Sequence, residues 1–551
     1  MNHTVRQKFS LPRSRAQQGY FALLAVVLIL VMGLMGSVIV NLFATRAQTS
    51  ANQLGGLRAF YLAESGLEIA SRLLTTSTFT GTGARVVCSA LTGTSTVTNA
   101  SLLNGTFTLS AVGTPVVAVT TLSSALTFTG STIAVTSFTN FAGNGRLHVE
   151  DELIDYEAVS GTNFINVTRG AGGSRVRSHA VGAPVSQYQC TVDSKAGIPS
   201  IAAPKYQRNV QAQVQLQDGW LVGDKQSNNF SLMRWNYPAG VDWNNSSLAG
   251  GSSASNLEGV SMLSNAFGFA VGGAVGTNFT FLRWNGTAWV LNAQAGACSN
   301  QHLLAVSLVS NQQGFAVGSR YRPACASSGN YRYTILRWNG SNWVALTPSV
   351  APTIPADAST NQNLNAVHVI DTNGDGLGNI GFAVGNAGHI LTYNGTSWTR
   401  ATSPTTQHLK GVYVVSASEA WAVGVNGVIL KYTGSWSLFT SPVSTDINAI
   451  SMLDTDNDGL ANFGVAAGSS GRLFIYNGTS WTFTDFGNTN FLAVGIFSPD
   501  DAWAAGASGS AYHWDGTVWS NIGTGTNNQI NAISLVLPGS NPVTNWRQIF
   551  R

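Results

Sequence analysis

The chain repeats one short pattern seven times between residues 209 and 536. Each copy has a stretch of small residues such as GFAVG, followed by a hairpin such as GHILTYNGTSW that ends in tryptophan. The closing tryptophans lie 38 to 55 residues apart and are Trp243, Trp289, Trp343, Trp398, Trp436, Trp481 and Trp519. Periods of about 40–50 residues are typical of four-stranded propeller blades, and Asn-Gly between aromatic residues indicates a tight hairpin turn. We therefore predict a seven-bladed β-propeller, with eight blades, the last one incomplete, as the alternative.

Such a ring must close on itself, because closure removes the exposed sheet edges that promote aggregation. The strand-like segment NVQAQVQL at 209–216 is expected to open the first unit, and NAISLV at 531–536 follows the seventh. One of the two segments should complete a blade made mostly by the other end of the chain. The small residues of AVG should lie near the axis and the tryptophans near the rim. The repeat resembles sialidase-like and photosystem-assembly-type propeller repeats.

An apolar run from Tyr20 to Ala44 contains no charged residue. It can cross the hydrocarbon layer, which needs about 20 helical residues, and it exceeds the roughly 7–15 residues of a secretory signal core. Four basic residues precede it and should stay cytoplasmic by the positive-inside rule; they are Arg6, Lys8, Arg13 and Arg15.

The helix is expected to continue beyond the membrane to Leu74, because residues 46–74 contain no proline. Phe60, Ala63, Leu67, Ala70 and Leu74 recur at helical spacing and form a stripe that needs a partner surface. A helix over 20–74 would be about 80 Å long at 1.5 Å per residue. A plain single-span anchor with a short linker is the alternative.

The basic leader ending in Gly19, the aromatic start at Tyr20, the apolar run and RAFYLAESGLEIASRLL at 58–74 together resemble type IV pilin-like proteins. The likeness is to PilX-type minor pilins and to the MshP subunit of mannose-sensitive haemagglutinin pilus systems, and it covers about the first 75 residues. The chain is therefore expected to be mostly β with one long N-terminal α-helix. The expected domains are a leader at 1–19, a helix at 20–74, a β-rich middle region at 75–205 and the propeller at 206–551.

The resemblance implies that a prepilin peptidase cuts between Gly19 and Tyr20. The retained helix would anchor the chain in the inner membrane and later pack among other pilin subunits in an extracellular filament. Major pilins carry a glutamate at the fifth mature position, where this chain has Leu24. Because an unpaired carboxylate in lipid is costly, its absence fits a tip or minor subunit.

The middle region is expected to form short strands with alternating faces. Its acidic cluster is expected to be a solvated hairpin turn, with catalytic acids or a cation site as alternatives; it comprises Glu150, Asp151, Glu152 and Asp155. His148 and His179 lie too far apart in sequence, with no third ligand, to predict a metal site.

Four cysteines form no CxxC pair, so a zinc or thioredoxin-like site is not predicted. In an exported chain two disulfides are permitted, and pairing by region gives Cys88–Cys190 and Cys298–Cys325. The alternative is that some of the four are buried free thiols.

Two blades carry matching acidic insertions, DTNGDGLGN at 371–379 and DTDNDGLAN at 454–462. Oxygen ligands at alternate positions, with glycine at the sharp turn, are how a short loop wraps Ca²⁺. Neither loop has the bidentate glutamate of an EF-hand, so a weaker structural calcium site is predicted, with a metal-free turn as the alternative. The candidate ligands are Asp371, Asn373 and Asp375 in one loop and Asp454, Asp456 and Asp458 in the other, with Asn379 and Asn462 assisting.

Catalysis is not expected, since the chain has no GxSxG, no HExxH, no phosphate-cradling glycine loop and no Asp-box turn. Nucleic acid is not an expected partner either, because no basic stripe with aromatic residues occurs in the body. A glycan or protein receptor would contact non-repeating loops such as the insertion at 319–333.

These features predict a minor, tip-type subunit of a type IV pilus or a related filament, which displays a propeller for adhesion or pilus assembly. The alternatives are a pseudopilin of a type II secretion system that handles cargo, and a membrane-anchored glycosidase-like hydrolase.

Overall fold

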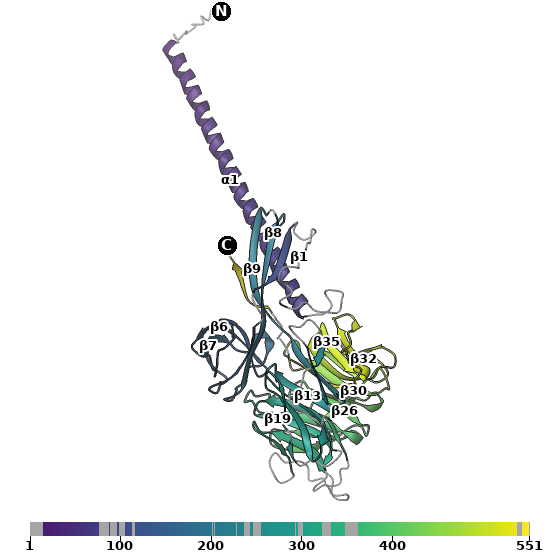
Figure 1. Ribbon diagram of the computed structural model, residues 1–551. Helices are drawn as coiled ribbons and strands as arrows, with labels where there is room; N and C mark the ends of the chain where they lie inside the picture. Colours follow the sequence, from purple (N-terminus) through teal and green to yellow (C-terminus); the bar gives the residue numbers. More distant parts are fainter. Residues whose placement is uncertain are drawn as a thin grey trace, which may run out of the picture.

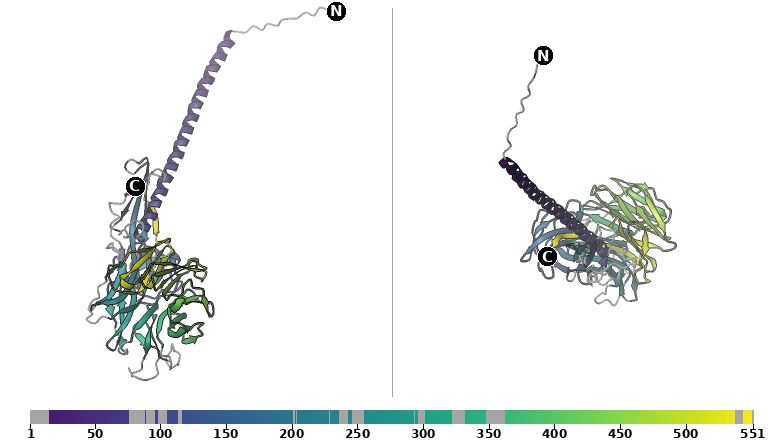
Figure 2. Two further views of the ribbon diagram at one scale, coloured as in Figure 1. Left: turned by 90° about the vertical axis from the view of Figure 1, so that its right-hand side faces the viewer. Right: turned by 90° about the horizontal axis from the view of Figure 1, so that it is seen from above.

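The computed structural model describes residues 15–75, 88, 96–97, 105–112, 116–200, 202, 204–227, 229–235, 243–245, 255–292, 294–295, 301–321, 332–347, 362–536 and 543–549. A long helix, α1, projects from a twisted antiparallel sheet, and a propeller lies at the far end of that sheet (Figure 1). The first half of α1 extends away from the rest of the molecule in every view (Figure 2).

Helix α1 spans Arg15–Thr75 without a break. Its apolar side chains are exposed along the first half; Leu30 is 61% exposed and Phe43 69%. The helix is long and apolar enough to cross a membrane, with a mean hydropathy of 2.6 over its most apolar window. Such a helix fits a membrane anchor or a signal sequence. Gly19 and Tyr20, the predicted processing site, lie inside its first two turns, and residues 1–14 of the predicted leader lie outside the described residues.

The second half of α1 packs on the sheet through the predicted stripe. Ala63, Leu67, Ala70 and Leu74 are buried, and Phe60 is partly buried. The stripe contacts apolar residues of the sheet that include Phe107, Leu109, Val192, Val210 and Ala212. Helix and strands approach closely at Gly66, where a Cβ atom would overlap the hydroxyl of Ser194 and the ring of Phe107. The prediction that the stripe on one face of this helix packs on a partner surface is confirmed.

The sheet under α1 runs in the order β1 (Thr96–Val97), β2 (Thr106–Ala111), β8 (Pro184–Ile198), β9 (Tyr206–Gln215) and β39 (Val543–Ile549), all antiparallel. The segment 209–216, expected to open the first blade, lies mainly in β9 and therefore belongs to this sheet. The chain leaves the sheet after β9, forms the propeller and returns to pair β39 with β9. The propeller is therefore inserted between two neighbouring strands, and its boundary falls after β9 and before β39.

A second insertion lies between β2 and β8 and is called here the β-module (residues 116–185). Its strands are β3 (Val116–Thr121), β4 (Ile133–Ala134), β5 (Gly145–Val149), β6 (Glu152–Ser160) and β7 (Asn163–Thr168), and the start of β8 completes it. Its own core includes Leu147, Ile154, Tyr156 and Phe164. The long strand β8 thus joins the β-module to the sheet under α1.

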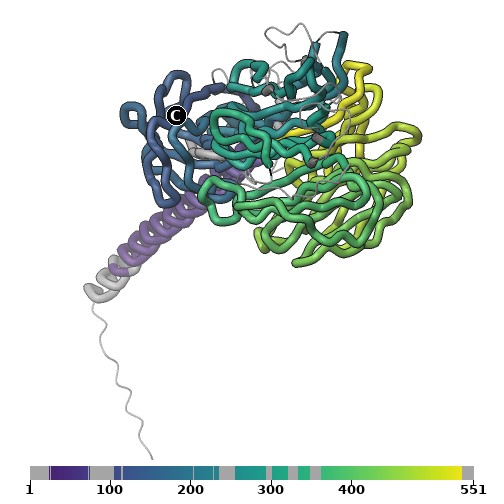
Figure 3. The backbone as a smooth tube through the Cα atoms, turned by 90° about the horizontal axis from the view of Figure 1, so that it is seen from below, coloured from purple at the N-terminus to yellow at the C-terminus, as the bar shows by residue number. Residues whose placement is uncertain are grey.

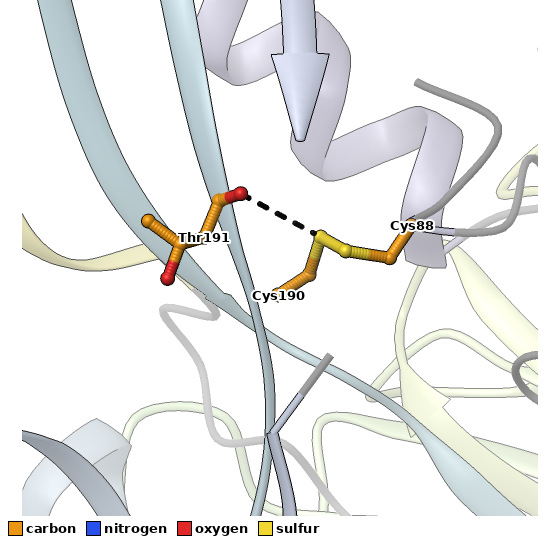
Figure 4. Close-up of a disulfide and its surroundings, with 3 residues drawn as sticks. All are labelled: Cys88, Cys190 and Thr191. Carbon is orange, nitrogen blue, oxygen red and sulfur yellow. Dashed lines mark hydrogen bonds between the residues drawn. A yellow bond between two sulfur atoms is a disulfide. The ribbon is translucent and has the colours of Figure 1, made fainter. Parts of the chain in front are cut away.

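Cys88 and Cys190 form a disulfide with their Cα atoms 6.0 Å apart (Figure 4). This is the first of the two pairs expected by region. It ties a residue beyond α1 to the middle of β8, within the core under the helix. Cys298 and Cys325 lie outside the described residues.

Seven further sheets form the propeller. Its chain passes from teal through green to yellow in the view from below (Figure 3). Blade one contains β38 (Ile530–Val536), β10 (Asp218–Gln226), β11 (Asn229–Trp235) and β12 (Trp243–Asn245). Blade two contains β13 (Leu257–Ser264), β14 (Phe267–Val275), β15 (Asn278–Trp284) and β16 (Trp289–Leu291), with the short β17 (Gln294–Ala295) beside β15. Blade three contains β18 (Leu303–Ser310), β19 (Gln313–Tyr321), β20 (Arg332–Trp338) and β21 (Trp343–Ala345).

The other blades are regular. Blade four contains β22 (Leu364–Ile370), β23 (Ile380–Gly385), β24 (Ile390–Tyr393) and β25 (Trp398–Ala401). Blade five contains β26 (Leu409–Val414), β27 (Ala420–Gly424), β28 (Ile429–Tyr432) and β29 (Trp436–Phe439). Blade six contains β30 (Ile447–Leu453), β31 (Phe463–Gly468), β32 (Arg472–Tyr476) and β33 (Trp481–Asp485). Blade seven contains β34 (Phe491–Ser498), β35 (Asp501–Gly506), β36 (Ala511–Trp514) and β37 (Trp519–Asn521).

The ring closes through β38, which comes from the end of the repeat region and pairs with β10. The segment 531–536, and not 209–216, therefore completes the first blade. Seven blades are confirmed. The repeated tryptophans open the outermost strands and pack against the preceding blade: Phe269 meets Trp343, and Phe315 meets Trp398, with ring centroids 5.3 and 5.4 Å apart.

Candidate functional site

The β-module contacts the propeller at the end where the inner strands finish. Ser178 donates its backbone N–H to the carbonyl of Gly374, at 2.7 Å. Arg175 Nη1 donates to the carbonyl of Asp371 at 2.9 Å, and Arg177 Nη1 to that of Val309 at 3.1 Å. The β-module therefore holds blades three and four through backbone carbonyls. We call this contact region the junction.

A buried charge cluster lies at the junction. His179 bridges two carboxylates, with Nδ1 2.6 Å from Glu150 Oε2 and Nε2 2.8 Å from Glu152 Oε2. The other oxygen of Glu150 accepts the backbone N–H of Asn311 in blade three. Glu150, Glu152 and His179 are each at most 2% exposed. The expectation of a solvated hairpin turn was therefore wrong: the turn between β5 and β6 exists, but two of its acids point inward and one contacts the propeller.

The ionisation of this cluster follows from its contacts. Burial favours neutral His179, but its hydrogen bonds to Glu150 and Glu152 outweigh burial and raise the pKa of the imidazole above its usual value. Burial would also raise the pKa of Glu152, yet hydrogen bonds from Arg169 and His179 lower it to about 2. Arg169 binds Glu152 through two nitrogens, each at 2.7 Å. The cluster is therefore a charged clamp in which each carboxylate already has partners.

The remaining acids of the predicted cluster are also paired. Asp151 lies 2.7 Å from Arg177 Nη2, and Asp155 accepts two hydrogen bonds from Arg146, at 2.7 and 3.0 Å. Asp151 and Asp155 therefore each have an arginine partner within the β-module. Sequence reasoning missed the clamp because the histidine that completes it comes from a distant part of the β-module.

The first acidic loop, at 371–379, is organised by its own backbone. Asp371 is buried, and its carboxylate accepts the N–H groups of Asn373, Gly374 and Gly376 at 2.8 to 3.0 Å. Asn373 Nδ2 donates to Asp375 at 3.1 Å. Asn379 accepts two hydrogen bonds from Thr372. This loop presents its carbonyls to the β-module, and its predicted ligands are engaged by one another and by the turn.

The second loop, at 454–462, differs. Carboxylate oxygens of Asp454, Asp456 and Asp458 all lie within 4.8 Å of one another. One oxygen of Asp454 accepts the N–H of Gly459 at 2.9 Å, and the other is buried without a hydrogen-bond partner in the described part of the chain. Asn462 accepts the backbone N–H of Thr455, just as Asn379 accepts that of Thr372 in the first loop. Three converging carboxylates are a suitable donor set for a hard cation.

Polar side chains on the inner strands connect neighbouring blades. Ser261, Ser307 and His368 occupy one register position, and each accepts the backbone N–H of the next inner strand at 2.8 to 3.1 Å. Burial lowers the pKa of His368 to about 4, so the neutral ring is the acceptor. These three residues therefore serve to join the inner strands of neighbouring blades. Aligning the repeats by register would have identified them, because serine recurs at the position that His368 fills.

No protein-family model and no curated protein matches the sequence. Among solved structures, YCF48 bound to a D1 peptide is 15% identical, with 51% of this chain and 90% of that chain covered and a TM-score of 0.36. YCF48 from Cyanidioschyzon merolae is 16% identical over 48% of this chain and 84% of its own, with a TM-score of 0.34. The WD40 β-propeller domain of Doa1 is 9% identical over 50% and 84%, with a TM-score of 0.37. From the strand pairing described above, the chain is a seven-bladed β-propeller protein with a long N-terminal apolar helix.

Proposed function

We propose that this protein is a minor subunit of a type IV pilus-like filament, placed at or near the tip, and that it displays its propeller outside the cell for adhesion or pilus assembly. The observation that supports this most is the division of α1 into two halves. The first half exposes apolar side chains around its circumference, and the second half packs one face on an antiparallel sheet. A helix of this kind suits a subunit that is first dissolved in lipid and then packed among similar helices.

The exposed apolar residues do not end with the membrane-length run. Leu54, Leu57 and Tyr61 are each more than half exposed on α1, at the level where its other face meets β8 and β9. Their spacing of three and four residues places them on one side of the helix. Covering this side with helices of neighbouring subunits would remove the apolar surface from water.

The way in which the propeller is attached to the sheet under α1 suits a domain that is displayed on a filament. The propeller leaves and rejoins the sheet through β9 and β39, which pair with each other, and the β-module braces it at the junction. With two covalent connections and a third contact, the propeller is held to the sheet that packs on α1. Its bulk would crowd a filament if every subunit carried it, so a low copy number is proposed.

Substitution of the residue before the proposed cleavage site tests this function. Gly19→Ala should block removal of the leader, because prepilin processing in the resembled family depends on that glycine, and should reduce the amount of this chain in purified filaments at least tenfold. Gly143→Ala is the control, since it lies outside α1 and a methyl group there meets nothing within 4 Å. Recovery of the wild-type chain with a secretion complex but not with surface filaments would favour the pseudopilin alternative and contradict the pilus role.

We also propose that the 454–462 loop binds Ca²⁺ as a structural ion. The support is the convergence of Asp454, Asp456 and Asp458 together with the unpartnered oxygen of Asp454. A ligand at 100 times its Kd stabilises the folded state by about 2.7 kcal/mol. Millimolar calcium should therefore raise the unfolding temperature of the full chain by several degrees over chelator. Asp456→Asn should remove most of the shift and Asp375→Asn should not; equal melting curves with calcium and with chelator would contradict the site.

A further inference from the structure

A pocket of about 230 Å³ lies between the β-module and blades two and three. One wall comes from β3 and the turn that leads into β8, and the opposite wall comes from the turns and hairpins of the two blades. The two walls approach closely beside the pocket, since a Cβ atom at Gly286 would lie 2.9 Å from Val119 Cγ1. Every lining residue belongs to the continuous described stretches 116–200, 255–292, 301–321 and 332–347.

The propeller repeat pairs a basic residue on the third strand of a blade with an acid at the start of the second strand. Each acid stands two residues before the residue that faces the basic one in the register. The pairs are Arg234 with Asp218 in blade one, Lys431 with Glu419 in blade five and His513 with Asp501 in blade seven. Blades four and six carry neither group, with Thr392 and Ile380 in one and Ile475 and Phe463 in the other.

Blade two has the basic residue of this pair without the acid. Arg283 occupies the basic position, and Phe267 stands where the acid would be. Blade three has Arg337 and Gln313 at the two positions. Of these two arginines, Arg283 lines the pocket, where it is the only charged residue.

The charge of Arg283 has no carboxylate partner within the described part of the chain. Its guanidinium lies over the rings of Phe267 and Trp338, 5.0 and 6.0 Å from their centroids. Burial lowers the pKa of Arg283 below its usual value, whereas a neighbouring carboxylate would raise it. The pocket is therefore missing the negative charge that the repeat supplies in three other blades.

A buried hydrogen-bond acceptor lines the same pocket. Asn311 is only 8% exposed, and its Oδ1 has no partner in the described part of the chain. Its backbone N–H binds Glu150, which pairs with His179 and not with Arg283. Because buried polar atoms are normally hydrogen-bonded, a donor from a ligand is expected at Asn311 Oδ1.

The β-module adds an apolar surface to the pocket. Val119 is 37% exposed and Val181 59% exposed, and Pro184 lies beside them in the lining. A ligand that covers this surface needs an apolar group as well as a negative charge. The volume is below the usual range of about 300–1,000 Å³ for small-molecule sites, so the ligand should be small.

We propose that this pocket binds a small branched-chain 2-hydroxycarboxylate. Its carboxylate would pair with Arg283, its hydroxyl would donate to Asn311 Oδ1, and its branched carbons would pack on Val119 and Val181. A hydroxyl is a small donor, which suits the volume, and the ammonium group of an amino acid would add a second positive charge near Arg283. The inference goes beyond the filament role and does not depend on it.

The test is calorimetric titration of the full chain in detergent micelles with 2-hydroxyisovalerate and three analogues that each lack one feature. The analogues are 2-hydroxyisovaleramide without the charge, isovalerate without the hydroxyl and glycolate without the branch. The hydroxy acid should bind in a 1:1 ratio, and each analogue should bind severalfold more weakly or not at all. Absence of binding by 2-hydroxyisovalerate, or equal binding by any analogue, overturns the proposal.

Variants locate the binding. Arg283→Gln should weaken it roughly tenfold or more, because hydrogen bonds between charged groups are the stronger ones. Phe267→Glu restores the acid of the repeat and should weaken binding similarly, since the new carboxylate would occupy Arg283 as Glu419 occupies Lys431. Lys225→Gln removes an exposed charge from blade one and should leave binding unchanged. Equal affinities of Arg283→Gln and Lys225→Gln would overturn the assignment, whether or not Phe267→Glu folds.

Discussion

Replacing His179 with leucine is expected to lower the free energy of unfolding by about 3–5 kcal/mol, the usual cost of breaking a buried ion pair from one side. The substitution leaves the carboxylates of Glu150 and Glu152 buried with no cation between them. Glu152 keeps Arg169, so the larger part of the loss should come from Glu150. Because Glu150 also accepts the N–H of Asn311, the loss should weaken the junction.

The same variant should change the pH dependence of stability. The pKa of His179 is raised in the folded protein above its ordinary value of 6.5. Its stabilising effect is therefore complete below pH 6.5 and declines as the pH rises through the folded pKa. The pKa of His368 is lowered to about 4, so its effect has the opposite sign and stability falls as the pH drops from 6.5 toward 4. His179→Leu should lose the alkaline decline and keep the acid one.

Thermal unfolding of the full chain between pH 4 and about 9 measures both effects. Glu157→Gln is the matched control, because Glu157 is an exposed residue of the same hairpin and its loss should change stability by less than about 0.5 kcal/mol. An unchanged alkaline slope in His179→Leu, or equal stability of the two variants, would show that the buried histidine does not hold the junction.

Gly424→Val is expected to destabilise the propeller by about 3 kcal/mol or more, at the upper end for an overpacked core. The backbone at Gly424 is extended, so glycine is not needed there for its dihedral angles. It is needed because a Cβ atom would overlap the carbonyl oxygen of His408, just before the inner strand of the same blade. No rotamer relieves an overlap at Cβ itself.

The control for Gly424→Val is Gly143→Ala, where a methyl group meets nothing within 4 Å. Gly385 and Gly506, at the same position in blades four and seven, meet the carbonyls of Asn363 and Asn490 in the same way. Urea unfolding followed by tryptophan fluorescence should give a lower midpoint for the valine variants at all three positions and a near-native midpoint for Gly143→Ala. Normal stability of Gly424→Val would contradict this explanation of the repeated AVG pattern.

The propeller could be predicted from the sequence because its information is local and repeated. Each blade carries its own hairpin turn, its own closing tryptophan and its own close-contact glycine, and seven copies average out the variation between them. The buried stripe of the helix from Phe60 to Leu74 could be predicted equally well, because a period of 3.6 residues identifies the buried face whatever it packs against.

The strands that pair with β9 could not be predicted from the sequence in the same way. Its alternating pattern indicates a strand, but it does not say which sheet the strand joins, and β39 lies at the other end of the propeller. The clamp was missed for a similar reason. An acidic run in a turn is usually solvated, and the burial of Glu150 and Glu152 depends on His179 and Arg169, which are brought in by the fold.

The two acidic loops show the limit of motif reasoning. Their sequences are nearly the same, yet Asp371 is covered by Arg175 of the β-module and saturated by backbone N–H groups. Asp454 keeps an unpartnered oxygen beside two further aspartates. The loops differ in their surroundings, which the motif does not encode.

The proposal as a whole depends on retention of the N-terminal helix after processing, and the mass of the mature N-terminal peptide measures this directly. The chain purified from filaments should begin at Tyr20 and keep the whole apolar run of α1. A mature chain that begins beyond Ala44 and is free in the medium, or one in filaments that still carries the residues before Tyr20, would contradict the account.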